Sequence, residues 1–255
     1  MFSPSEVLRY SQQFKLDGVG ILGQEKLKTA RVLCVGLGGL GSPLLMYLAA
    51  SGIGTLGIID GDQVELSNLH RQVLYRTSDI SRNKSHAAKE SLLAINPAIS
   101  VEAYDGHFTD ENSSDLIGQY DIVADCTDNF LTRYLIHDAC YALKKPYFYA
   151  AVSKFQGQCS VFDGNDGPCL RCLYPIPNLF GNCQDSGVLG VLPGLLGIIQ
   201  ATEIMKWIFN IGNTLKDKLL VVDLLKMSFK EIHLTKNPDC PFCSRRNKEF
   251  RHPAP

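Results

Sequence analysis

The sequence predicts an α/β fold of the Rossmann-like, nucleotide-binding kind, built on one mixed sheet that is parallel in its N-terminal half and antiparallel in its C-terminal half. The apolar run Val32 to Val35 leads directly into a G-x-G-x-x-G turn over residues 36–41. As far as residue 143, short apolar runs alternate with amphipathic stretches, which indicates parallel strands joined by helices. Beyond residue 146 the apolar runs come in close pairs, which is typical of antiparallel hairpins.

The N-terminal arm, residues 6–29, is predicted to be helical in two pieces, because glycines interrupt it. These glycines are Gly18, Gly20 and Gly23. After the glycine turn, Ser42 and Pro43 begin a helix that ends near Gly52. Proline fits the first turn of a helix because the N–H that it lacks would have no partner there.

The nucleotide-binding half, residues 30–150, continues the same alternation. We expect further strands at 55–59, 100–104 and 120–126, and helices at 84–95, 110–118 and 130–143. Pro97 ends the helix at 84–95, since the residue before a proline avoids helical angles. The run Thr127-Asp128-Asn129 supplies a cap for the next helix. Between these elements, residues 66–75 are polar and irregular.

The C-terminal half, residues 151–243, is predicted to be antiparallel. We expect paired strands at 146–152 and 157–162, a long helix at 194–209, and a second strand pair at 218–224 and 228–234. The most apolar run of the chain, residues 188–209, contains Pro193, Gln200, Glu203 and Lys206. A buried or interface helix is therefore favoured over a membrane span.

Length and composition set the broad class. The chain has 255 residues, of which 45% are hydrophobic, so we expect a single domain with a large core over residues 1–243 and a disordered polar tail at 244–255. A formal net charge of −1 argues against a nucleic-acid partner. The chain carries no recognisable signal peptide, and its nine cysteines then indicate a reducing, cytoplasmic setting.

The glycine turn predicts a phosphate-binding site. Glycines allow the backbone to approach a ligand closely, and a helix start offers free N–H groups and a partial positive charge. Asp60 follows the second strand, where a dinucleotide-binding fold places the acid that binds ribose hydroxyls. The turn alone suits NAD enzymes and other nucleotide-binding proteins alike, and a tight turn without a ligand is also open.

Charged side chains follow several predicted strands. Asp60, Asp62 and Asp128 lie at the strand ends where an open α/β sheet binds its ligand. One or two carboxylates there could hold Mg²⁺ on a phosphate chain, and Arg71 and Lys84 could neutralise a triphosphate. Taken singly, each of these charges is also compatible with a solvated surface position.

The cysteines fall into two groups. Two C-x-x-C pairs, Cys169 with Cys172 and Cys240 with Cys243, supply the four thiolates of a tetrahedral Zn²⁺ site with no open position, which predicts a structural zinc. A redox-active pair or free thiols are the alternative. Four others are expected to be buried: Cys34, Cys126, Cys140 and Cys159. Cys183 lies in a polar, glycine-flanked loop, where a thiol could be a nucleophile, a sulfur acceptor or an incidental surface group.

Together these motifs resemble the MoeB/ThiF/HesA family, relatives of the catalytic half of ubiquitin-activating enzymes. The likeness extends from about Leu8 to Cys243 and includes the glycine turn, Asp60-Gly61-Asp62, the run Leu-Ser-Asn-Leu-His-Arg-Gln at 66–72, Asp-Cys-Thr-Asp-Asn at 125–129, and both cysteine pairs. The resemblance implies an ATP-dependent adenylyltransferase. Its substrate would be the C-terminal Gly-Gly carboxylate of a ubiquitin-like sulfur carrier of the MoaD or ThiS kind, in molybdopterin or thiamin biosynthesis.

The resemblance also implies the site. Residues expected to bind the nucleotide are Gly36, Gly38, Gly39, Gly41, Asp60, Asp62, Ser67, Asn68, Arg71, Gln72, Lys84, Asp128 and Asn129. Within this set, Asp60 would take the ribose hydroxyls, Arg71 and Lys84 would face the triphosphate, and Asp128 would bind Mg²⁺. Cys183 matches a loop cysteine that is linked to covalent attachment of the carrier.

The expected assembly is a homodimer whose sites borrow residues from the partner subunit. No sulfurtransferase segment follows Cys243, so a separate sulfur donor is expected. Gln12 stands where the family motif Arg-Tyr-x-Arg-Gln has its second arginine. Because glutamine carries no charge, a carrier-binding protein with weak catalysis stays open, as does an enzyme that adenylates another peptide or a small carboxylate. An NAD-linked oxidoreductase is a further alternative, although the polar residues 67–72 and Lys84 suit a triphosphate better than a nicotinamide.

Overall fold

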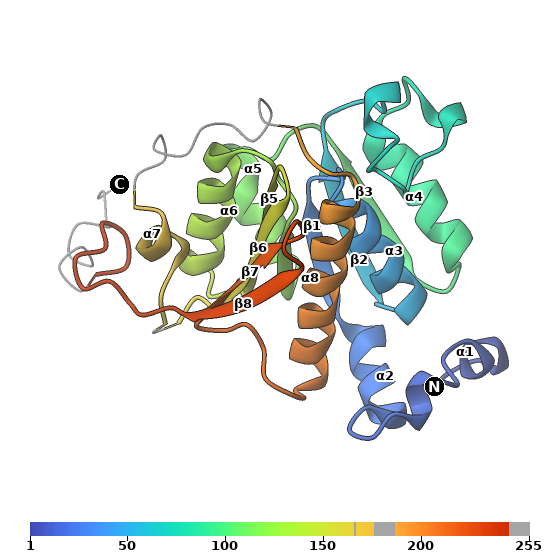
Figure 1. Ribbon diagram of the computed structural model, residues 1–255. Helices are drawn as coiled ribbons and strands as arrows, with labels where there is room; N and C mark the ends of the chain where they lie inside the picture. The colour runs from blue at the N-terminus through green and yellow to red at the C-terminus, as the bar shows by residue number, and fades with distance from the viewer. Residues whose placement is uncertain (166, 176–186, 245–255) are drawn as a thin grey trace.

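The computed structural model describes residues 1–165, 167–175 and 187–244 (Figure 1). These residues form one sheet of eight strands in the order β3-β2-β1-β4-β5-β6-β7-β8. The strands are β1 Arg31–Val35, β2 Thr55–Asp60, β3 Ser100–Asp105, β4 Ile122–Asp125, β5 Tyr147–Ser153, β6 Gln156–Phe162, β7 Lys218–Asp223 and β8 Ser228–His233. Neighbours from β3 to β5 are parallel and neighbours from β5 to β8 are antiparallel. The predicted mixed sheet is confirmed.

Helices cover both faces of this sheet. They are α1 Pro4–Arg9, α2 Gly20–Thr29, α3 Gly41–Ser51, α4 Lys84–Ile95, α5 Asp110–Gly118, α6 Phe130–Ala142, α7 Leu170–Leu173 and α8 Val191–Phe209, with short 3-10 turns η1 Gln13–Lys15, η2 Leu66–Asn68 and η3 Thr77–Asp79. Figure 1 shows α5 and α6 on one side of the sheet and α3, α4 and α8 on the other. The parallel strands therefore lie between two helical layers.

The two layers explain why the parallel strands are apolar throughout. In β1, Val32 and Cys34 belong to the core beneath α3 and α8, whereas Leu33 and Val35 belong to the core beneath α5 and α6. All four are buried. A strand with both faces covered loses the alternation of polar and apolar residues, so it appears in the sequence as a continuous apolar run.

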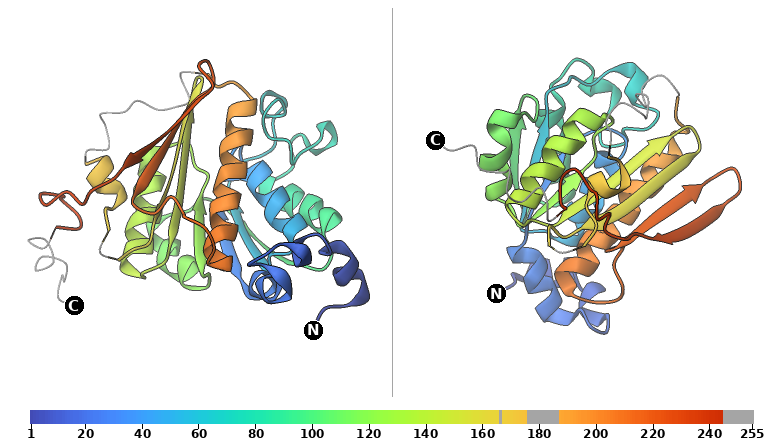
Figure 2. Two further views of the ribbon diagram at one scale, coloured as in Figure 1. Left: turned by 60° about the horizontal axis from the view of Figure 1, so that its bottom comes forward. Right: turned by 90° about the vertical axis from the view of Figure 1, so that its left-hand side faces the viewer.

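Helix α8 begins three residues earlier than expected, at Val191 rather than at 194. Pro193 lies in its first turn, where a missing N–H costs no intrahelical hydrogen bond. In the described part of the chain α8 is the one helix long and apolar enough to cross a membrane, by length and composition alone. It packs against α3, β5 and β6, and Figure 2 shows it lying along the sheet beside α3. These contacts are those of a core helix.

The N-terminal arm is tied to the end of α3. Gly52 ends that helix with φ of +86°, and a Cβ on it would stand 2.6 Å from the Tyr10 ring. Asn96, which ends α4, donates to the Tyr10 hydroxyl at 2.8 Å and to the Ala49 carbonyl at 2.7 Å. These buried bonds fix the arm against the nucleotide-binding half. Of the expected tail, Ser244 is buried and residues 245–255 lie outside the described residues.

Candidate active site

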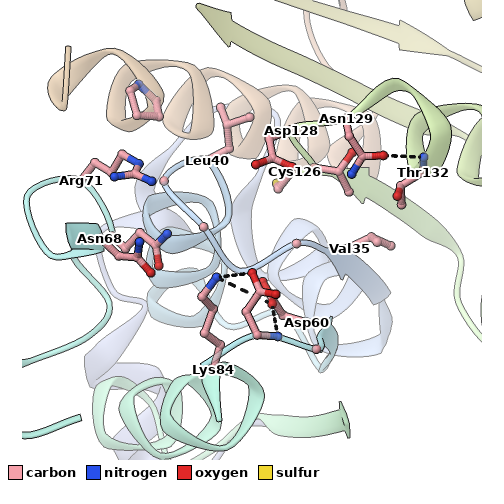
Figure 3. A pocket seen from close by; sticks show the side chains of 18 of the residues that line it. Val35, Leu40, Asp60, Asn68, Arg71, Lys84, Cys126, Asp128, Asn129 and Thr132 are labelled. Atoms are coloured by element: carbon pink, nitrogen blue, oxygen red, sulfur yellow. Dashed lines mark hydrogen bonds and ion pairs between the residues drawn. The ribbon is translucent and has the colours of Figure 1, made fainter. Parts of the chain in front are cut away.

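A cavity of about 860 Å³ opens at the carboxyl ends of β1, β2 and β4 (Figure 3). Its volume falls in the range of ordinary ligand pockets. The structure brings together at its wall nearly all the residues expected to bind a nucleotide: Gly36, Gly38, Gly39, Asp60, Asp62, Ser67, Asn68, Arg71, Gln72, Lys84, Asp128 and Asn129. Their roles in binding stay predictions, but their convergence follows from the topology, because parallel strands place their carboxyl ends at one edge of the sheet.

The glycine turn lies at the centre of this wall. Gly36 has φ of +91°, and a Cβ on it would stand 2.8 Å from the carbonyl oxygen of Cys126. Gly41 is instead buried at the start of α3, where a Cβ would stand 2.3 Å from the carbonyl oxygen of Gly36. The first glycine therefore permits the turn and the last permits close packing of α3 on it. Leu40, which directly precedes α3, lines the cavity, so the partial positive charge at the start of that helix lies close to it.

Asp60 bridges the glycine turn and the end of its own strand. One carboxylate oxygen accepts from the backbone N–H of Leu37 at 2.8 Å, and the other accepts from the backbone N–H of Asp62 at 2.9 Å. Each oxygen keeps capacity for a further donor such as a ribose hydroxyl. The carboxylate is thus held in one orientation before any ligand arrives.

Lys84, the first residue of α4, lines the cavity beside the end of β2. Its side chain is 6% exposed, and its ammonium lies 2.8 Å from Asp62 Oδ2 and 3.8 Å from Asp60 Oδ1 (Figure 3). The family resemblance predicts a lysine that faces a triphosphate. In the structure the cation is shared by two carboxylates, so a phosphate at this point would compete with Asp62 for it.

Arg71 and Asn68 come from the polar segment after β2 and lie on the opposite side of the cavity from Asp128 and Asn129 (Figure 3). Arg71 donates to the Ser67 carbonyl at 3.1 Å, and its Cγ would lie 3.5 Å from a Cβ on Gly39. The guanidinium is thereby placed beside the glycine turn, as a phosphate-binding role requires.

Asp128 is positioned by a buried polar network. Asp125 accepts from the Thr127 N–H at 2.9 Å, from the Thr127 hydroxyl at 2.7 Å and from the Tyr147 hydroxyl at 2.5 Å. Arg133 donates to the Thr127 carbonyl at 2.7 Å. Burial raises the pKa of the Asp125 carboxyl, and the neighbouring charge of Arg133 opposes that rise. The backbone N–H and the carbonyl oxygen of Thr127 are therefore both hydrogen-bonded, and the next residue, Asp128, lines the cavity.

Asn129 and Gln72, two of the residues expected to bind the nucleotide, differ in the hydrogen bonding of their side chains. The Asn129 side-chain oxygen accepts from the Thr132 N–H at 2.9 Å and so caps α6, as its place before a helix predicts. Gln72 is buried, and its side-chain oxygen has no hydrogen-bond partner within the described residues. A polar ligand group would satisfy that atom, which fits a cavity built to hold a polar molecule.

Sequence reasoning assigned no role to Arg133, His70, Asp125 or Tyr147. Arg133 carried a usable signal in the sequence, because it is a charged residue on the apolar side of the expected helix 130–143. In the structure it is 1% exposed. His70 lies within the polar segment and also lines the cavity. Tyr147, one of the partners of Asp125, lies on a different strand, so nothing local in the sequence indicated that contact.

The four paired cysteines lie together, as predicted. The Sγ atoms of Cys169, Cys172, Cys240 and Cys243 all lie within 4.8 Å of one another. The Sγ atom of Cys169 lies 3.8 Å from that of Cys172 and 3.7 Å from that of Cys240, and those of Cys172 and Cys243 lie 3.4 Å apart, against about 3.8 Å for thiolates on a tetrahedral zinc. Short α7 carries the second cysteine of the first pair. The cluster could therefore hold zinc.

The remaining cysteines divide as expected where the structure describes them. Cys34, Cys126, Cys140 and Cys159 are buried. Burial raises the pKa of the Cys126, Cys140 and Cys159 thiols, which makes them poor nucleophiles. Cys183 lies outside the described residues, and Gln12 is exposed just before η1.

Comparison with known proteins identifies relatives for nearly the whole chain. Residues 10–242 match the ThiF family. The sulfur carrier protein adenylyltransferase of Thermus thermophilus is 45% identical over 250 residues, which cover 95% of this chain and 92% of that protein. A probable adenylyltransferase/sulfurtransferase, MoeZ of Mycobacterium tuberculosis, is 44% identical over 94% of this chain, which spans 63% of its length. The adenylyltransferase and sulfurtransferase MOCS3 of Sus scrofa is 44% identical over 96% of this chain, which spans 54% of its length.

Solved structures give the same fold. E. coli MccB, in a crystal structure with AMPCPP and MccA, superposes with a TM-score of 0.81 at 26% identity, covering 92% of this chain and 74% of that one. PaaA superposes with a TM-score of 0.78 at 25% identity, covering 92% of this chain and 84% of that one.

Proposed function

Because this chain belongs to the ThiF family, we propose that it is an ATP-dependent adenylyltransferase that activates the C-terminal Gly-Gly carboxylate of a ubiquitin-like sulfur carrier. Two observations together support the proposal. A protein named for this activity is 45% identical over 92% of its length. In this chain the glycine turn, Arg71 and Asp128 line a single cavity.

Different residues of the cavity have different roles in the proposed reaction. The carrier carboxylate attacks the α-phosphorus of ATP, the bond to the bridging oxygen breaks, and pyrophosphate leaves an acyl-adenylate behind. The backbone at Gly38 and Gly39 cradles phosphate, Asp60 holds the ribose, and Arg71 takes charge on the triphosphate. Such chemistry depends on positioning and charge neutralisation rather than on proton transfer by a side chain.

Two metals fit the donor sets of this chain. The Asp128 carboxylate points into the cavity and suits Mg²⁺, which would neutralise charge on the triphosphate when bound (Figure 3). The four cysteine sulfurs suit Zn²⁺, which would have a structural role because no ligand position stays open.

The partners belong to the same proposal. A carrier of the MoaD or ThiS kind, a sulfur donor and a second copy of the chain complete the system, in molybdopterin or thiamin biosynthesis. Gln12 is exposed and can donate a hydrogen bond to a partner subunit's nucleotide, but it supplies no charge. A carrier-binding protein that catalyses slowly is therefore the second candidate.

ATP–pyrophosphate exchange with purified carriers of both kinds tests these candidates. We expect exchange that depends on one Gly-Gly-ended carrier and is abolished by Asp128→Ala. Asp115→Ala, an exposed acid on α5, is the matched control and retains exchange. A protein that binds ATP but exchanges with no carrier would overturn the first proposal. A large gain in exchange rate on Gln12→Arg, from a low starting rate, would favour the second.

A further inference from the structure

His70 lies between the nucleotide cavity and the start of α8, and the proposed chemistry gives it no role. It lines the cavity next to Arg71, the residue proposed to take charge on the triphosphate. We propose that His70 is a positioning residue: its Nε2 atom accepts a hydrogen bond that holds the Arg71 guanidinium in place for ATP. This inference rests on the proposed function, since it assigns a further residue to the same site.

The contact itself fixes which form of His70 is present. The Arg71 Nη1 atom lies 2.9 Å from His70 Nε2. A guanidinium has donors and no acceptor, so Nε2 must accept and cannot carry a proton. The proton of the neutral ring is then on Nδ1. The same Arg71 nitrogen donates to the Ser67 carbonyl at 3.1 Å, so the guanidinium is held between a backbone and a side-chain acceptor.

The start of α8 holds His70 in that position. A Cβ placed on Gly190 would stand 2.7 Å from the His70 carbonyl oxygen and 3.1 Å from His70 Nδ1. No side chain fits between them, so the helix start lies directly against His70. Gly190 precedes Val191, the first residue of α8, which is anchored in the core by Leu192 and Leu196. Arg71 is thus connected through His70 to a rigid core helix.

Equilibrium binding of MgATP to the full chain, without any carrier, tests the proposal. His70→Leu removes the acceptor, and we expect its dissociation constant at about pH 8 to rise roughly fivefold. His70→Gln offers an acceptor oxygen that does not titrate, and we expect near-normal affinity there. His233→Leu, on edge strand β8, is the control and should follow the wild type.

A pair of glycines tests the contact with α8. Gly190→Ala forces a Cβ onto His70, whereas Gly194→Ala, four residues along the same helix, meets nothing within 4 Å. We expect Gly190→Ala to weaken MgATP binding several-fold and Gly194→Ala to leave it unchanged. Equal affinities in His70→Leu and wild type, or an affinity of His70→Gln as low as that of His70→Leu, would overturn the inference. A wild-type protein that binds no ATP at all would instead overturn the proposed function.

Discussion

At the scale of single residues, the most informative group is the buried carboxylate of Asp125. A buried charge is unfavourable unless donors and an opposite charge compensate for it. Here Thr127 and Tyr147 donate to Asp125, and Arg133 supplies the opposite charge while it holds the Thr127 carbonyl. These groups come from β4, β5 and α6, so the turn that carries Asp128 is fixed by three elements. We interpret the network as preorganisation of the Asp128 carboxylate.

Tyr147→Phe tests that interpretation. The change removes one donor to Asp125 without altering the shape of the core, and we expect a loss of about 1–2 kcal/mol in the free energy of unfolding. Because Asp128 would then be less firmly placed, the Mg²⁺ concentration for half-maximal exchange should rise several-fold. Tyr149→Phe is the matched control, since both rings are 1% exposed in one aromatic cluster. Equal magnesium dependence in the two variants, with similar stability, would contradict the interpretation.

The sequence predicted which residues line the cavity better than it predicted their contacts. Asp60, Asp62 and Asp128 could be found because each lies at or just beyond the end of a strand, and strand ends of a parallel sheet meet at one edge. The pairing of Lys84 with Asp62 could not be predicted, because it depends on how α4 packs against the end of β2. Local patterns carry no record of such side-chain geometry.

At the scale of elements, the expected helices at 84–95 and 110–118 agree with α4 and α5. These boundaries were predictable because caps, a following proline and the hydrophobic period all act within a few residues. Helix α7 was not predicted, since Leu170–Leu173 is too short to show any period. Its place is set by the cysteines on either side of it, which is a tertiary constraint.

The glycine turn is the element on which the cavity depends most. Gly36→Ala would place a Cβ 2.8 Å from the Cys126 carbonyl oxygen at φ of +91°. We expect about 1–3 kcal/mol loss of stability together with much weaker ATP binding. Gly20→Ala is the control, because φ there is +57° but nothing lies within 4 Å and the residue is far from the cavity in sequence. Urea unfolding and MgATP binding measure both effects; a Gly36 variant that loses stability but binds ATP normally would contradict this role.

At the scale of the whole molecule, strand β5 joins the two halves of the fold. It pairs with β4 in parallel and with β6 in antiparallel orientation, so the nucleotide-binding half and the hairpins share one sheet. The mixed sheet was predictable because the sequence changes from alternating to paired apolar runs near residue 146. Contacts such as that of His70 with Gly190 were not, since they join segments far apart in the sequence.

The cysteine cluster closes the molecule at its C-terminal end. It joins residues 169–172, beside α7, to residues 240–243, which follow β8. Arg171 connects the cluster to the core, because it lies 2.7 Å from Asp138 and its guanidinium stacks on Tyr134 and Phe242. With zinc bound, this closure would order the chain beyond the sheet, and the free energy of metal binding would contribute to folding.

Removal of the metal should therefore destabilise the whole protein. We expect chelation, with loss of zinc confirmed by elemental analysis, to lower the melting temperature by about 5 °C or more, since about 1 kcal/mol corresponds to 2–4 °C in a protein of this size. Cys240→Ser should have the same effect without chelator. Cys140→Ala, which removes a buried cysteine outside the cluster, should keep its zinc. If zinc were lost and the melting profile stayed unchanged, Arg171 and the packing around Phe242 would be sufficient to hold this end of the chain, and the metal would have no structural role.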